Sequence, residues 1–179
     1  EGVAFSSLND GWVVGYESSE GGSVGFVMHW GDTTWEEPPG VPSPYDYYSA
    51  PPFLFGVVAF SPQDSWAVGE GHRGCLTLHW DGTNWHEVPN PFDLLDFGRC
   101  WLYSISARSH EDIWVAGTLL GGAGANDRGL VIRWNNAEWL DMQLPARGWT
   151  NSILMLSADN GWVGGDELFH WNGQSWEKA

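Results

Sequence analysis

The feature that most constrains how this chain folds is a pattern of serine, aspartate, tryptophan and glycine that occurs four times. The stretch 57–69 aligns without a gap with the stretches 3–15, 105–117 and 153–165. Each copy begins with an apolar run, continues through a serine and a turn-forming Asp or Asn, and has a tryptophan three residues before a glycine. Such self-similarity is the sequence signature of a repeat architecture.

Three columns of this pattern are the most informative. The turn-forming residues are Asp10, Asp64, Asp112 and Asn160. The tryptophans are Trp12, Trp66, Trp114 and Trp162. The closing glycines are Gly15, Gly69, Gly117 and Gly165. Because tryptophan is normally one of the rarest residues, its fixed place in every copy indicates a repeated structural use.

A second pattern follows each copy of the first. It occupies residues 29–35, 79–85, 133–139 and 170–176, and four residues separate its two tryptophans in every copy. Between them, Asp-Gly, Asn-Gly and Asn-Asn pairs supply the positive φ angles that a tight turn needs. With three tryptophans in each of four copies, the two patterns account for twelve of the 14 tryptophans.

Each copy is predicted to form four short strands. The apolar run is the first, the segment around the first tryptophan is the second, and the segments before and after the turn pair are the third and fourth. Four-stranded repeats with glycine and aromatic signatures predict an all-β fold, a β-propeller of four four-stranded blades. We assign 1–179 to a single domain, with blades at about 2–38, 56–90, 104–145 and 152–179.

The two motifs, Ser-x-x-Asp-x-Trp-x-x-Gly and His-Trp-Asp-Gly-x-x-Trp, carry a resemblance to a known family. The chain resembles bacterial kelch-like and Asp-box-like β-propeller repeat proteins, including the photosystem-assembly-type propellers. Asp81 lies four residues before Trp85, whereas the family's Asp-box turn has its Asp five residues before the Trp. These turns are structural in the family, so the resemblance implies the fold and no activity.

The chain holds a whole number of blades, which favours closure into a four-bladed ring. Two chains combining into a larger ring, or a longer array, stay open as alternatives. On one face of the disc the predicted turns are constant in length, whereas on the other they range from 166–167 to 118–128. Because loops carry function on a fixed scaffold, this variable face is the predicted recognition surface.

Two sets of aromatic residues are candidate contacts on the variable face. The connection 38–52 is rich in proline and holds three tyrosines. A second set precedes the first residue of an apolar run by four positions. The two sets are Tyr45, Tyr47 and Tyr48, and Phe53, Trp101 and Trp149. Rigid aromatic side chains offer contact area to a protein or a sugar ring. The alternative is that both sets only pack against the blades.

The charge of the chain excludes several classes of partner. With seven Lys+Arg against 23 Asp+Glu, the formal net charge is −16. Such a surface repels the phosphates of nucleic acids and of anionic membranes, and it suits a cationic partner. No apolar run reaches the roughly 20 residues that span a bilayer.

No motif assigns a catalytic residue, a metal site or a cofactor. His29, His79 and His170 share one repeat position with Arg133, which predicts a structural hydrogen bond to the neighbouring blade. The other histidines lack metal-ligand spacing. A carboxylate pair for glycoside hydrolysis stays open, since 23 acidic residues allow some pair in space.

The chain has two cysteines, Cys75 and Cys100. One opens a strand of the second blade and the other enters the third, so neighbouring blades can bring them within disulfide range. An even count fits an oxidising compartment and predicts an extracellular or cell-surface location. Free buried thiols are the alternative.

These features together predict a non-enzymatic extracellular or cell-surface propeller that binds a protein or glycan through its variable loops. Two other classes stay open. One is a structural subunit of a repetitive extracellular assembly or filament, in which the loops are contacts for self-assembly. The other is a carbohydrate-active enzyme or lectin, which the exposed aromatic residues would serve.

Overall fold

The structure is a computed structural model that describes residues 1–19, 22–42, 52–71, 74–92, 99–121 and 126–179. All regular secondary structure in these ranges is β-strand, with sixteen strands in antiparallel sheets. The prediction of an all-β chain is therefore confirmed for the described residues.

The strands form four successive antiparallel meanders, which we call units 1 to 4. Unit 1 comprises β1 (Gly2–Ser7), β2 (Asp10–Ser19), β3 (Gly22–Gly31) and β4 (Thr34–Glu36). Unit 2 comprises β5 (Phe53–Ser61), β6 (Asp64–Glu70), β7 (Cys75–Trp80) and β8 (Trp85–Glu87). Unit 3 comprises β9 (Arg99–Ser109), β10 (Asp112–Leu120), β11 (Arg128–Trp134) and β12 (Trp139–Asp141). Unit 4 comprises β13 (Thr150–Ser157), β14 (Asn160–Gly165), β15 (Leu168–Trp171) and β16 (Trp176–Lys178).

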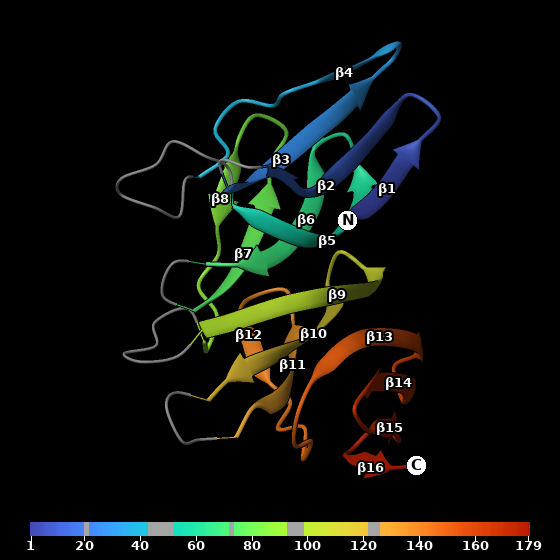
Figure 1. The fold of residues 1–179 in the computed structure, drawn as a ribbon. Coiled ribbons are helices and arrows are strands. Elements are labelled where there is room, and N and C mark those ends of the chain that lie inside the picture. The colour runs from blue at the N-terminus through green and yellow to red at the C-terminus, as the bar shows by residue number, and fades with distance from the viewer. Residues whose placement is uncertain (20–21, 43–51, 72–73, 93–98, 122–125) are drawn as a thin grey trace.

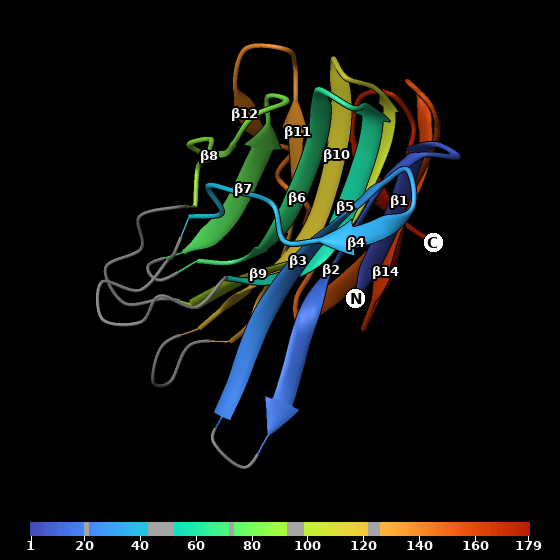
Figure 2. The same cartoon turned by 90° about the horizontal axis from the view of Figure 1, so that it is seen from above.

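The four units stand side by side as an arc, with the last strands β4, β8 and β16 at its outer margin (Figure 1). Figure 2 shows the same strands from above, where the long strands of neighbouring units run alongside one another. Successive first strands are in contact, β1 with β5, β5 with β9 and β9 with β13. Units 2 and 3 are joined into one sheet by the pairing of Glu70 with Trp101.

The arc does not close on itself. Among the described strands, no contact comparable to that between β1 and β5 joins β13 to β1. Units 1 and 4 lie at opposite ends of the arc in Figure 1. The expectation of a closed four-bladed ring is therefore not confirmed. A whole number of repeats does not determine the rotation between neighbours, which the side chains between them set.

One hydrogen bond explains two columns of the repeat. In unit 1, Nε2 of His29 lies 2.8 Å from Oδ1 of Asp10, because β2 and β3 pair with His29 opposite Trp12. The equivalent pairs are His79–Asp64 (2.9 Å), Arg133–Asp112 (2.8 Å) and His170–Asn160 (2.9 Å). Every bond lies within one unit, so the expected bond to the neighbouring unit is wrong. These side chains tie each first turn to its own third strand.

The turn between the third and fourth strands also repeats. Its second residue has a positive φ in every unit, at Asp32 (58°), Gly82 (93°), Asn136 (73°) and Gly173 (92°). In unit 2, Asp81 accepts bonds from the backbone N–H groups of Asn84 (2.9 Å) and Thr83 (2.8 Å). These hydrogen bonds lower the pKa of the Asp81 carboxyl, and the bond from Asn84 has the largest effect. Local hydrogen bonds therefore account for this turn, as expected of a structural motif.

Tryptophans fill the space between units. Trp12 of unit 1 contacts both tryptophans of the unit 2 pair, with ring centroids 5.0 Å from Trp80 and 4.9 Å from Trp85. Trp66 makes the same contacts with unit 3, and Trp114 makes them with unit 4. The rings of Trp12 and Trp114 are completely buried. The repeated tryptophans are thus the core of each interface, where aromatic rings bury the most apolar area per residue.

Cys75 and Cys100 form a buried disulfide between units 2 and 3, with Cα atoms 4.7 Å apart. The two positions are separated by 25 residues. Restricting a loop of this length in the unfolded chain stabilises the fold by about 3 kcal/mol.

We expect the double variant C75A/C100A to lose about that much unfolding free energy in urea titrations. Alkylation of two thiols in the unreduced wild-type protein would contradict the bond.

Candidate aromatic binding site

A row of aromatic rings links all four units. The centroid of Tyr16, on β2, lies 5.6 Å from that of Phe53 and 6.3 Å from that of Phe55, both on β5. Phe55 lies 5.3 Å from Tyr103 on β9. Tyr103 stacks with Trp149, just before β13, at 6.0 Å and an interplanar angle of 26°. The row therefore runs across the start of the first strands in units 2 to 4.

Trp101 completes the row, with its ring 6.0 Å from Tyr103 and 5.5 Å from Trp149. A pocket of about 270 Å³ opens among these rings, lined by Tyr16, Ser23, Phe53, Phe55, Glu70, Trp101 and Tyr103. Small-molecule sites usually measure roughly 300–1,000 Å³, so this pocket suits a side chain of a larger partner. We call the pocket and its neighbour Trp149 the aromatic site.

Strand periodicity explains why these rings share one surface. Successive side chains of a strand point to opposite faces, so Phe53 and Phe55 emerge on the same side of β5. Trp101 and Tyr103 do the same on β9. The residues between them, Leu54 and Leu102, are fully buried on the other side. The apolar side of each strand start therefore holds the strand in place, while the aromatic side faces the pocket.

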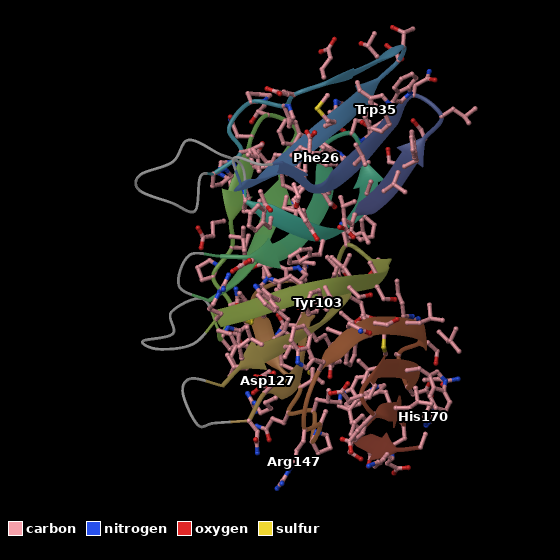
Figure 3. The ribbon with its side chains drawn as sticks, in the orientation of Figure 1. Phe26, Trp35, Tyr103, Asp127, Arg147 and His170 are labelled. Atoms are coloured by element: carbon pink, nitrogen blue, oxygen red, sulfur yellow. A yellow bond between two sulfur atoms is a disulfide. The ribbon has the colours of Figure 1, made fainter. Side chains whose placement is uncertain are left out.

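Two carboxylates, those of Glu70 and Asp127, lie at the aromatic site. Glu70, which lines the pocket, is buried and forms an ion pair with Arg99, whose Nε lies 3.1 Å from Oε1. Asp127 accepts a hydrogen bond of 2.9 Å from the indole Nε1 of Trp149. Figure 3 labels Tyr103, which lies on β9, and Asp127, which directly precedes β11. Burial, and then the charges of Glu70 and Asp127, raise the pKa of the Tyr103 phenol well above its usual range.

A guanidinium already occupies one edge of this site. The Cζ atom of Arg99 lies 5.3 Å from the centroid of the Trp101 ring, beside the carboxylate of Glu70. A cation over an aromatic face is attracted by the ring quadrupole, and a nearby carboxylate adds to that attraction. The site therefore combines the two features by which proteins hold a cationic side chain.

The structure places Phe53, Trp101 and Trp149 in this one site. All three follow connections on the variable face, the face proposed for recognition. The tyrosines Tyr45, Tyr47 and Tyr48 lie outside the described residues. That these six side chains contact a partner stays a prediction.

Sequence reasoning missed three rings of the site: Tyr16, Phe55 and Tyr103. For two of them a signal was available, because Phe53-x-Phe55 and Trp101-x-Tyr103 place aromatic residues two apart at the start of an apolar run. Tyr16 directly follows the closing glycine of the first repeat, and nothing in its neighbourhood indicates an aromatic contact with β5.

Other kinds of site find little support in the described part of the chain. It contains no group of three or more His, Cys, Asp or Glu side chains that could hold a metal ion. It contains no helix, and therefore no helix that is long and apolar enough to cross a membrane. A second pocket of about 470 Å³ lies at the outer margin, between β12 and the end of unit 4, with Asp141 and Trp176 in its wall.

Comparison with known proteins supports the fold. No family model matches the chain, and no curated protein matches it. Among solved structures it is similar to one described as YCF48 bound to D1 peptide, with 14% sequence identity and a TM-score of 0.52. The match covers 99% of this chain and 51% of the other, so this chain spans about half the length of that protein. The likeness shows a β-propeller fold, and the finer kelch-like and Asp-box-like assignment stays a prediction.

Proposed function

We propose that this chain is a protein-interaction module whose aromatic site binds a cationic side chain on an extended segment of a partner protein. The observation that carries the proposal is the guanidinium of Arg99 above Trp101 and beside Glu70. The same rings and carboxylates continue to Tyr103, Trp149 and Asp127 along the row. The propeller with the similar fold is bound to a peptide in its structure, which supports a protein partner.

The overall charge supports the same chemistry. A net charge of −16 attracts cationic segments from a distance and raises their rate of association. The rings are fixed by contacts with one another, so little conformational entropy is lost when a partner binds. Tyr and Trp at such positions are typical of the few residues that dominate binding energy.

A random peptide library displayed on phage tests the proposal, with the purified chain as bait. We expect enrichment of peptides with Arg or Lys beside apolar residues. Trp149→Ala is expected to raise the dissociation constant of a synthesised, enriched peptide at least about tenfold, as for a typical hot spot. Trp162→Ala is the matched control, because both tryptophans are 38% exposed and only Trp149 belongs to the site.

Either of two results would overturn this function. One is that no peptide is enriched over bait-free beads. The other is that enriched peptides bind the Trp149→Ala and Tyr103→Ala variants as tightly as the wild-type chain. Fluorescence anisotropy of labelled peptides, at two salt concentrations, measures both the affinities and their electrostatic part.

A glycan is the second candidate for the same site. The observation that favours it is the exposed indole of Trp149 with its hydrogen-bonded neighbour Asp127, a ring and a carboxylate that suit a sugar ring and its hydroxyls. Binding on a glycan array that depends on Trp149, together with failure of the peptide selection, would favour the glycan. The extracellular or cell-surface location is part of this proposal, and the disulfide between Cys75 and Cys100 supports it.

A further inference from the structure

The rings that line the pocket of the aromatic site stand at an angle to one another. Tyr16 meets Phe53 at 58° and Phe55 at 87°. Trp101 meets Tyr103 at 65°, and Phe55 and Tyr103 are tilted by 38°. Parallel rings would make a flat platform, whereas rings at these angles form walls around a space. We call these five rings, which come from β2, β5 and β9, the cage.

The two other described side chains of the pocket already have hydrogen-bond partners. Glu70 is only 6% exposed, and its Oε1 accepts hydrogen bonds from two nitrogens of the Arg99 guanidinium. The hydroxyl of Ser23 lies 3.0 Å from that of Ser18. The two phenol oxygens of the cage are the remaining side-chain acceptors of the described lining.

This shortage of acceptors discriminates between cations. A guanidinium or a primary ammonium brings several N–H donors into the pocket. A donor that leaves water and finds no acceptor loses its hydration without compensation. The pocket is therefore better suited to a cation that carries no N–H group.

The surroundings of the cage nevertheless favour positive charge. The Cζ atom of Arg99 lies 5.3 Å from the ring centroid of Trp101, which shows that a cation can rest against this wall. Burial raises the pKa of the Tyr103 phenol, and the charges of Glu70 and Asp127 raise it further. A field that disfavours a phenolate favours a cation at the same place.

We propose that the cage binds the trimethylammonium group of a trimethylated lysine on the partner segment. Such a group carries a full positive charge under an apolar surface of methyl groups and donates no hydrogen bond, so it suits aromatic walls with few free acceptors. The inference rests on the proposed function and specifies the side chain that the site prefers. Trp149, which stacks on Tyr103 and lies beside the cage, then contacts the residues that flank the lysine.

NMR titrations of the labelled chain with blocked amino acids test the inference without a selected peptide. The probes are Nα-acetyl-trimethyllysine amide, the same compound with an unmethylated lysine, and its uncharged analogue with carbon in place of the charged nitrogen. We expect the trimethylated probe to bind at least about tenfold more tightly than the unmethylated one, and at least about fivefold more tightly than the uncharged one. Equal affinity for the trimethylated probe and either of the others would overturn the inference.

Phosphocholine, which carries the same trimethylammonium group, identifies the source of the ligand. Tighter binding of the trimethyllysine probe supports a protein segment, because the row of rings beyond the cage then has a chain to contact. Tighter binding of phosphocholine would overturn the proposal in favour of a choline head group.

Phe55→Leu tests the cage itself, because it keeps an apolar side chain on β5 and removes one aromatic wall. The preference for the trimethylated probe should fall at least about fivefold, and Phe55→Tyr should retain it. Tyr16→Leu is a second variant at a residue that is 40% exposed, so its fold should persist. Phe5→Leu is the matched control, since this exposed ring contacts Trp35 and does not line the pocket. A preference unchanged in folded Phe55→Leu and Tyr16→Leu proteins would overturn the cage.

The inference and the proposed function fail in different ways. An enriched peptide that binds equally well with lysine or trimethyllysine at the same position would overturn the inference alone. A chain that binds the trimethylated probe through Tyr16 and Phe55 but enriches no peptide would overturn the proposed function, which needs no methyl group, and would leave the ligand class of the cage standing.

Discussion

The Gly165→Ala variant is expected to lose at least about 3 kcal/mol of unfolding free energy, while Gly164→Ala stays within about 1 kcal/mol of the wild type. A Cβ atom at Gly165 would lie 2.0 Å from the carbonyl oxygen of Trp149 and 2.7 Å from the Cα of Thr150. Both atoms belong to the backbone, so the strands themselves would have to separate. At Gly164 the nearest atom is Cδ1 of Leu168 at 3.8 Å, an ordinary contact.

Urea titrations of the two variants and the wild type, at one protein concentration, measure this difference. The same close approach explains the closing glycines of units 2 and 3. A Cβ atom at Gly69 would lie 2.0 Å from the carbonyl oxygen of Phe53, and one at Gly117 would lie 2.2 Å from that of Trp101. These carbonyls belong to the residues of the aromatic site. The closing glycines therefore allow the close strand approach that positions the backbone of the aromatic site. Equal stability of the Gly165→Ala and Gly164→Ala variants would contradict that role.

The second large loss of stability is expected for a repeat tryptophan that is buried between two units. Trp114→Ala should cost about 3–5 kcal/mol, because the fully buried indole leaves a cavity between units 3 and 4. Trp162→Ala should cost clearly less, since this residue is 38% exposed and its removal leaves a smaller cavity. The two residues occupy the same position in the repeat, so the contrast isolates burial from residue type.

Thermal and urea unfolding of the two variants and the wild type measure both costs. A loss for Trp162→Ala as large as that for Trp114→Ala would mean that the fourth unit also buries its tryptophan within one chain. The open arc would then be wrong, because it leaves Trp162 uncovered.

The repeat made most of the fold predictable. Strand order, the turn with positive φ and the pairing of each turn-forming residue with a third-strand side chain all depend on contacts within one unit, where spacing in the sequence determines spacing in space. The bond between His29 and Asp10 shows the limit of this reasoning. The shared column was evident from the sequence, but the partner was assigned to the wrong unit because strand register was not known.

Features between units were harder to predict. Ring closure depends on the rotation that packing around residues such as Trp12 and Trp66 imposes, and no spacing in the sequence encodes that rotation. The aromatic site was found in part, through the shared position of Phe53, Trp101 and Trp149. Tyr16 joins it only because β2 of unit 1 leans against β5 of unit 2, a contact that the sequence does not reveal.

Oxidative footprinting of individual tryptophans, read by mass spectrometry, tests most directly whether the aromatic site binds a peptide. An enriched peptide should protect Trp149 from oxidation and leave Trp162 reactive. Trp162 is as exposed as Trp149 and lies outside the site, so it is the internal control, while the buried Trp114 stays unreactive throughout. Protection of both exposed tryptophans together, or of neither, would contradict the account.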